Sequence, residues 1–439
     1  MCEAVSVCIC DNRIFMLTHL APITAWIAIW VLCVLVFLLI LWRPRQIPES
    51  VWAVAGATLL VLFHLLPLKS AWTAVRAGTD VYCFLAGMML LAELARQHGV
   101  FDWLAELALE HARGSQMRLF VLVYGIGIVV TSLLSNDATA VLLTPAVLAV
   151  VRRTKTSPLP YLFACALIAN AAGIVLPISN PANLVVFDGQ LPALGEWMRI
   201  FLVPAVSAIG ITFLMLWWRS HCDLRPSIED GVKPARLNPM GRRAGLGILL
   251  AAGALLAVSA RGGPVGPAAL AAGAVAMLFV AGTRWRVMAA ALRHMSWSVI
   301  PLVAGLFVMV AALREVGALG ISADALQKAA SWPAVAGLTA VAFGFGIAAN
   351  AINNLPMGLI GAAAVNAAHG TRAMHSAVLL GIDLGPNLSV TGSLATILWL
   401  IALRRENIEV SGWRFLRTGI LVMPPALLVA VLSLVLMQR

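Results

Sequence analysis

The sequence predicts an all-α polytopic membrane protein with two inverted repeats of about five transmembrane helices. Each repeat is expected to contain a re-entrant helical hairpin and a broken helix. Three observations lead to this fold class: an apolar composition, apolar runs of membrane-spanning length, and a resemblance between the two halves. Of the 439 residues, 61% are hydrophobic and only 11% are charged, with a mean hydropathy of +0.94. A soluble protein carries about 25% charged residues, so the composition argues against soluble enzymes and for a membrane protein.

The apolar runs have the lengths that helices need to cross a bilayer, which is about 20 residues. The first run, Ile23 to Trp42, contains Thr24 as its only polar residue. A lead of residues 1–22 precedes it, in which we expect no cleavable signal peptide, and Met16 is an alternative start to Met1. The further runs are Val51–Pro67, Val81–Ala95, Phe201–Trp218, Gly245–Ala260, Val265–Gly282, Val299–Leu313 and Thr418–Met437.

The two halves of the chain resemble each other at a constant offset of 218 positions. The matching residues are Ala86-Gly87 with Ala304-Gly305, Gly99 with Gly317, and Asn136 with Asn354. The apolar runs follow the same offset. We therefore expect a first repeat over 23–218, a cytoplasmic linker over 219–243 and a second repeat over 244–437.

Short apolar arms on either side of a polar tip predict a hairpin in each repeat. The arms within 119–151 and within 335–365 are each shorter than the roughly twenty residues of a full span. Interrupted apolar segments at 161–187 and 373–403 predict the broken helices. Twelve full crossings are the alternative, and they leave every loop on the same side of the membrane.

The basic residues indicate how the chain lies in the membrane. The formal charge is +11, and the basic residues fall between the spans, which fits the positive-inside rule and anionic lipid better than nucleic acid. With the amino terminus outside and five crossings per repeat, most basic residues fall in inside loops. An odd number of crossings turns the second repeat upside down, which is typical of secondary transporters.

Polar residues interrupt the apolar runs at four places, at matching positions in the two halves. Irregular backbone is tolerated at membrane depth only where it is buried in protein or lines a cavity, so one central site is the simplest reading. Asn and Ser in such helices also often just hydrogen-bond a neighbouring helix. A charged carboxylate costs more free energy at membrane depth than an amide or a hydroxyl and is more often functional. Glu93 is the exception, because we expect it to pair with Arg96. The candidate residues are Ser135, Asn136, Asp137, Thr139, Asn170, Asn180, Asn183, Asn353, Asn354, Asp383, Thr391, Ser393 and Thr396.

Three strings within these breaks resemble one family. They are LLSNDATAVLLTP from Leu133 to Pro145, Asn353-Asn354-Leu355-Pro356, and GIDLGPNLSVTGSLATILWL from Gly381 to Leu400. In these strings the chain resembles the ArsB-type arsenite/antimonite efflux proteins of the ion-transporter superfamily. The resemblance covers nearly the whole chain after Thr24. It implies a carrier, not an enzyme, that expels trivalent arsenite and antimonite across the bacterial inner membrane by proton antiport.

The resemblance also implies roles for the candidate residues. Arsenite is an uncharged trihydroxide at neutral pH, so amides and hydroxyls suit it better than an arginine clamp. We expect the Asn, Ser and Thr candidates to bind the substrate and Asp137 and Asp383 to carry the coupled protons, because burial disfavours a charged carboxylate. The expected partners are the substrate, protons and membrane lipid, with a peripheral arsenite-stimulated ATPase subunit as a candidate. No cofactor, resident metal or nucleic acid is expected.

Two departures and two competing functions stay open. Many relatives carry an acidic residue where Asn170 stands and a basic residue at Asn387, which bears on the ion stoichiometry.

One competing function is a sodium-coupled anion carrier, although such carriers usually show Ser-Asn-Thr at both hairpin tips. The other is a Na⁺/H⁺ antiporter, for which two buried aspartates suffice. Elevator-like and rocking movements are both compatible with this sequence.

Overall fold

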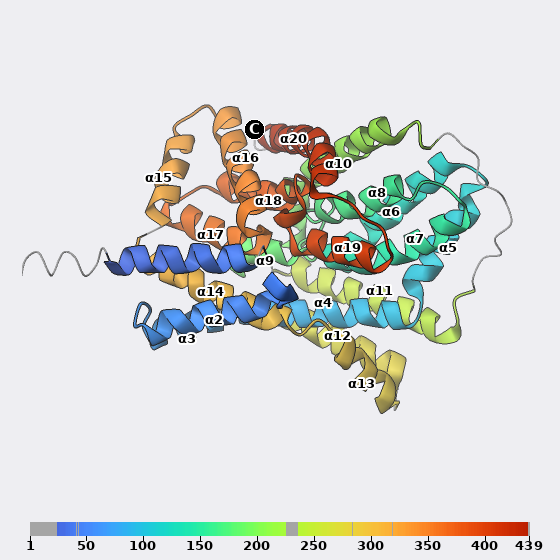
Figure 1. Ribbon diagram of the computed structural model, residues 1–439, viewed down its shortest axis with the longest axis horizontal. Coiled ribbons are helices and arrows are strands. Elements are labelled where there is room, and N and C mark those ends of the chain that lie inside the picture. Colours follow the sequence, from blue (N-terminus) through green and yellow to red (C-terminus); the bar gives the residue numbers. More distant parts are fainter. Residues whose placement is uncertain are drawn as a thin grey trace, which may run out of the picture. The chain divides into compact units, whose positions relative to one another are not determined.

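The computed structural model describes residues 24–40, 42, 44–224, 236–282, 284–317 and 319–437. Every regular element in these residues is a helix (Figure 1). The lead 1–22 lies outside the described residues, as does the middle of the linker, 225–235. The chain divides into two compact units, Met1–Gly78 with Ser298–Gly320, and Thr79–Trp297 with Ile321–Arg439.

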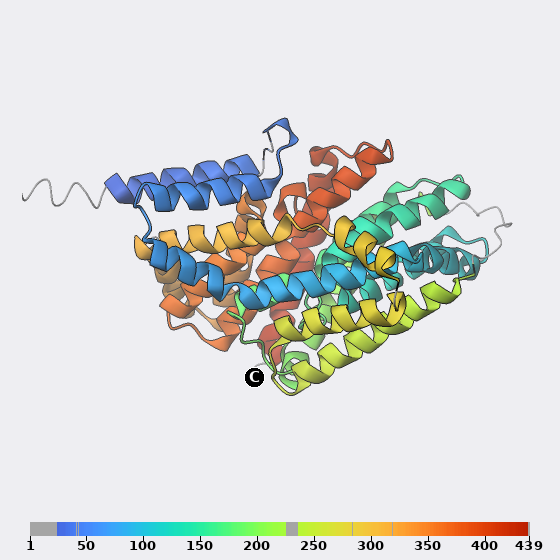
Figure 2. The same cartoon turned by 90° about the horizontal axis from the view of Figure 1, so that it is seen from below.

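In the first unit, α14 (Val299–Glu315) packs against α2 (Glu49–Leu62) and α3 (Leu68–Ala77). Glycine permits the close approach, since a Cβ at Gly305 would lie 2.7 Å from the backbone of Ala53. The helix Thr24–Ile40 runs beside α2 in both views (Figures 1 and 2), where Gly56 faces Val36.

The second unit holds the remaining helices. In order these helices are α4 (Thr79–Gln97), α5 (Val100–Ala112), α6 (Gln116–Leu133), the π-helix η2 (Ala138–Leu143), α7 (Thr144–Arg153), α8 (Leu159–Ala171), α9 (Pro181–Val186), α10 (Leu194–Ser220), α11 (Pro239–Ala260), α12 (Val265–Ala281), α13 (Trp285–His294), α15 (Leu319–Ala330, which belongs to this unit from Ile321 on), α16 (Ala334–Ile352), α17 (Asn354–Ala367), α18 (Arg372–Leu384), the 3₁₀ turns η3 (Gly385–Asn387) and η4 (Val390–Gly392), α19 (Leu394–Arg405) and α20 (Gly412–Met437). In one group, α4 packs against α11 and α12. In the other, α8, α10, α16, α18 and α20 lie around the helix breaks.

The order of helices recurs at the offset found in the sequence. α2 to α10 and α12 to α20 follow one another as equivalent elements, and Thr24–Ile40 corresponds to α11. The equivalent helices α10 and α20 pack together, with Ser207 Oγ 3.1 Å from Ser433 Oγ. Further along, Leu216 of α10 lines the same small cavity as Thr418 of α20. From the first contact to the second, the residue numbers rise along α10 and fall along α20, so the two helices are antiparallel. Because they are equivalent helices of the two repeats, the second repeat is inverted relative to the first.

Five of the described helices are long and apolar enough to cross a membrane: α6, α10, α11, α16 and α20. Both broken helices are present, as α8–α9 and α18–α19. The first hairpin arms, α6 and α16, have 18 and 19 residues and are longer than expected. Of the second arms, α7 is shorter than expected, with 10 residues, and α17 is longer, with 14.

The expected run Val51–Pro67 is wrong in its extent, because α2 ends at Leu62. His64 takes a left-handed backbone conformation with φ 55°, and Pro67 precedes the next helix. The structure adds α3 and, at the equivalent place in the second repeat, α13. Both are ten-residue helices with interspersed basic residues, so they lack the long apolar run by which the spans were found.

The contact between α4 and α12 gives a test of the fold. A Cβ at Gly87 would lie 2.2 Å from backbone atoms of Ala269. We expect Gly87→Val to destabilise the protein by about 3 kcal/mol, because neither backbone can yield as a side chain could. Unfolding temperature in detergent measures this. Gly253→Val on α11 is the control, since a Cβ there meets nothing within 4 Å, and equal unfolding temperatures for the two variants would contradict the packing.

Candidate functional site

The carboxylate of Asp383 lies at the centre of the second unit. Asp383, near the end of α18, is fully buried, and its Oδ1 accepts a hydrogen bond of 2.7 Å from Asn180 Nδ2. Its Oδ2 has no hydrogen-bond partner among the described residues. A Cβ at Gly173 would lie 3.0 Å from this Oδ2, so the glycine lets the broken segment after α8 approach the carboxylate.

A second buried cluster joins the two broken helices. Asn170, at the end of α8, donates from Nδ2 to Asn387 Oδ1 at 2.9 Å and to Thr396 Oγ1 at 3.5 Å. Asn387 in turn donates to the carbonyl of Leu167. The hydroxyls of Thr396 and Ser393 lie 2.7 Å apart at the start of α19. Asn170 and Asn387, the two positions that the sequence analysis singled out for the ion stoichiometry, are thus direct partners of each other.

The break between α8 and α9 is held by side chains of its own segment. Asn183 donates from Nδ2 to the carbonyl of Gly173 at 2.9 Å, and also reaches those of Leu176 and Pro177. Its Oδ1 has no partner among the described residues. Much of Asn183 therefore serves to satisfy irregular backbone, which membrane depth requires.

The first hairpin tip contacts this break. The backbone N–H of Asn136 donates to the carbonyl of Ser179, whose hydroxyl donates to the carbonyl of Ser132. Asp137 is half-buried, and its carboxylate makes no hydrogen bond or ion pair within the described part of the chain. Thr139 is fully buried and pairs with the hydroxyl of Thr131 at 2.8 Å.

A residue that the sequence analysis missed links the second hairpin to the second broken helix. Asn350, on α16, donates to the carbonyls of Gly346 and Gly385, and its Oδ1 accepts from Ser389 at 2.7 Å. Thr391 donates to the carbonyl of Asn350 at 2.7 Å. Asn350 thereby ties α16 to both 3₁₀ turns of the second broken helix. Its signal was an amide one turn before Asn353 and Asn354, inside an otherwise apolar run.

Several predicted site residues cap the helices that begin inside the protein. Ser135 accepts from the N–H of Ala138, Asn180 from Ala182, Asn353 from Leu355 and Ser393 from Thr396. Such capping contributes about 1 kcal/mol each. The side-chain oxygens of these four residues therefore have a structural partner already.

The structure brings some candidate residues together and leaves others apart. Asn180 meets Asp383, and Asn170 meets Thr396, whereas the described residues show no side-chain hydrogen bond from Asn353 or Asn354 to another candidate. Among the described candidate residues, three have a buried acceptor atom without a partner: Asn170 Oδ1, Asn183 Oδ1 and Asp383 Oδ2.

The charge of the site is set by its acids. The buried polar residues of the described chain include no Lys, Arg or His, and the same residues contain no group of three His, Cys, Asp or Glu side chains placed to hold a metal ion. The other buried acid, Glu93, is paired as expected, since Arg96 Nε donates to it at 2.7 Å.

Inverted repeats with helices broken at a buried, largely uncharged polar centre define a multi-pass membrane transporter rather than an enzyme. The chain belongs to the citrate transporter family, which it matches over residues 37–382. Its relatives include an "Arsenical pump membrane protein" of Escherichia coli, 27% identical over 92% of this chain and 97% of that protein. Another of the same description, from Yersinia enterocolitica, is 28% identical with the same coverage.

A solved structure supports the fold. The Alcanivorax borkumensis YdaH transporter, described as having an unusual topology, superposes with a TM-score of 0.58 over 85% of this chain and 89% of its own, at 16% identity. The expected resemblance to ArsB-type proteins is confirmed by the curated relatives. The chain is a multi-pass protein of the bacterial inner membrane.

The bond between Asn180 and Asp383 predicts a measurable coupling. A hydrogen bond to a buried carboxyl group contributes about 2 kcal/mol, so we expect Asn180→Leu and Asp383→Leu together to cost about 2 kcal/mol less than the sum of the single variants. Denaturant unfolding in detergent measures the cycle. Thr371→Ala with Asp383→Leu is the control, because Thr371 caps the opposite end of α18, about 18 Å along the helix, and their effects should add within about 0.5 kcal/mol. Additivity in the first pair would contradict the bond.

Proposed function

We propose that the protein exports trivalent arsenite and antimonite across the inner membrane in exchange for protons. The observation that carries the proposal is a buried polar centre made of amides, hydroxyls and acids, in which none of the described residues is basic. This chain matches its curated relatives over nearly their whole length, and the names of those relatives point to the same substrate class.

The unpartnered acceptors suit such a substrate. Arsenite as an uncharged trihydroxide offers three O–H donors, and Asn170 Oδ1, Asn183 Oδ1 and Asp383 Oδ2 are acceptors without partners among the described residues. A buried polar atom that lacks a partner costs about 1–3 kcal/mol, so a ligand that donates to these atoms recovers that cost. We assign substrate binding first to Asn170 and Asn183, with Thr396 and Ser393 beside them.

We assign proton coupling to the two aspartates. Asp383 is enclosed and bonded to Asn180, whereas Asp137 is half-buried at the hairpin tip. Keeping a carboxyl group charged inside a membrane protein costs free energy. Uptake of a proton by either aspartate therefore favours conformations in which that carboxyl group is enclosed by protein. A peripheral ATPase subunit stays a candidate partner, for which the inside loops are the accessible surface.

Transport into inverted membrane vesicles tests the coupling. We expect a proton gradient to drive arsenite uptake by the wild type and expect Asp137→Asn and Asp383→Asn each to reduce it at least about tenfold, the effect of 1.4 kcal/mol. Glu93→Gln is the matched control, because this buried acid is already paired with Arg96. If the wild type moves no arsenite but exchanges Na⁺ for H⁺, the antiporter function replaces this proposal.

Substrate competition tests the chemistry of the site. Without a buried basic residue, a trianion such as citrate would have to lose its hydration with no charge to compensate it. We therefore expect excess antimonite to inhibit arsenite uptake and excess citrate at neutral pH to leave it unchanged. Inhibition by citrate with no effect of antimonite would favour the sodium-coupled anion carrier.

A further inference from the structure

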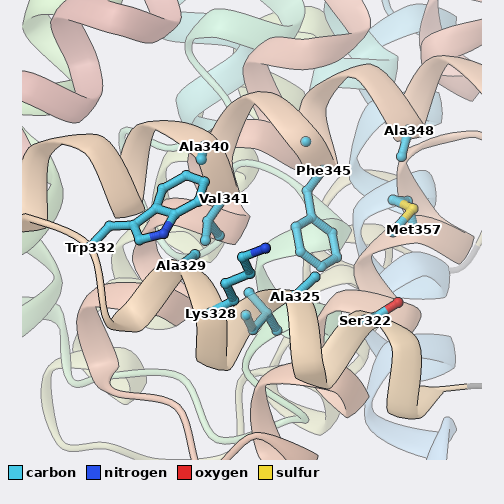
Figure 3. Close-up of a pocket in the computed structure, with 12 residues that line it drawn as sticks. Ser322, Ala325, Lys328, Ala329, Trp332, Ala340, Val341, Phe345, Ala348 and Met357 are labelled. Carbon is cyan, nitrogen blue, oxygen red and sulfur yellow. The ribbon is translucent and has the colours of Figure 1, made fainter.

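We propose that the groove between α15 and α16 binds an anionic phospholipid, with an acyl chain along the groove and the headgroup at Lys328. The groove has a volume of about 440 Å³, and its lining includes Met357, in the first turn of α17. Its walls are apolar except for Ser322 and Lys328 (Figure 3). An apolar groove of this kind on a membrane protein suits a hydrocarbon chain.

The groove lies where several wall positions of the second repeat carry smaller residues than their equivalents in the first. In the first repeat, the equivalent helices α5 and α6 pack directly against each other. The wall positions that are small in the second repeat carry larger residues in the first: Ala325 for Leu107, Ala340 for Leu122, and Gly344 for Ile126. A Cβ at Gly344 would meet nothing within 4 Å. A side chain of the size that the first repeat carries at position 126 would therefore enter the open space beside Gly344.

Two large residues border the groove instead of filling it. Trp332 and Phe345 stand where the first repeat has Gly114 and Gly127. In Figure 3 the Lys328 side chain extends between the rings of Trp332 and Phe345. Trp332 is 45% exposed, and Trp is enriched at the level of lipid headgroups. An acyl chain in the groove would therefore bring its headgroup to this lysine.

The charge selects the kind of lipid. Lys328 is exposed and makes no ion pair with any described residue, and Glu110 occupies the equivalent position in the first repeat. The second repeat therefore has both the open groove and a reversed charge at its end. A second copy of the chain fits less well, because a two-fold interface through this groove would bring two lysines toward each other.

Native mass spectrometry of the full-length protein in detergent tests the proposal with phosphatidylglycerol and phosphatidylcholine of identical acyl chains. We expect the wild type to prefer phosphatidylglycerol about fivefold, the effect of one basic residue at a membrane surface. Lys328→Glu should abolish the preference and Lys328→Arg should keep it. Arg261→Glu, an exposed cation at the end of α11, is the control and should change nothing.

A variant that fills the groove distinguishes lipid binding inside the groove from a general attraction of anionic lipid by surface charge. Gly344→Ile, which copies the first repeat, should lose tight binding of both lipids, whereas Gly253→Ile on α11 should not. Equal binding of the two lipids by the wild type, or a preference that survives Lys328→Glu, overturns the proposal. It is also overturned if Gly344→Ile removes a dimer and leaves lipid binding intact. If Gly344→Ile does not fold, the exposed Lys328 variants decide alone.

Discussion

The structure depends on one constraint: helices that begin inside a membrane protein must have their backbone satisfied by the chain itself. Hydrocarbon offers no hydrogen bonds, and each unsatisfied group costs several kcal/mol. Four helical segments begin at the polar breaks of the second unit, and the first turn of each receives a side-chain cap, from Ser135, Asn180, Asn353 and Ser393. The polar residues that interrupt the apolar runs are therefore first a condition for breaking the helices at all.

This constraint reduces the number of groups that can face a ligand. An asparagine at a cap has its oxygen engaged, and only its amide nitrogen remains. Asn180 uses both ends, since its oxygen caps α9 and its nitrogen donates to Asp383. The groups that keep a free acceptor, Asn170, Asn183 and Asp383, come from the two broken helices. The candidate binding site is therefore formed by helix breaks of both repeats. The hydrogen bond from Asn170 to Asn387 joins these breaks, although the two residues are more than 200 positions apart in the sequence.

The sequence predicts the positions of the helices well and the side-chain contacts between them poorly. The offset between Gly87 and Gly305 aligns nearly every helix of the two repeats, because an apolar run long enough to span a bilayer has few alternatives. The helices α3 and α13 escape this signal, being short and carrying basic residues. Which amide meets which carboxylate depends on how broken helices pack, and no periodicity encodes that. Asn350 was missed for the same reason, since its partners Gly385 and Ser389 lie in turns far along the chain.

The differences between the repeats carry as much information as their likeness. Asp137 corresponds to Leu355 and Asp383 to Cys165, so each repeat contributes one acid, at a place where the other has an apolar residue or a thiol. Two identical inverted repeats would make the inward and outward states equal in energy. Here the first repeat places its acid, half-buried and unbonded within the described chain, at a hairpin tip, and the second places its acid, enclosed, in a broken helix. In the proposed exchange the two acids therefore meet water and protein differently, which lets protonation of one favour a different state from protonation of the other.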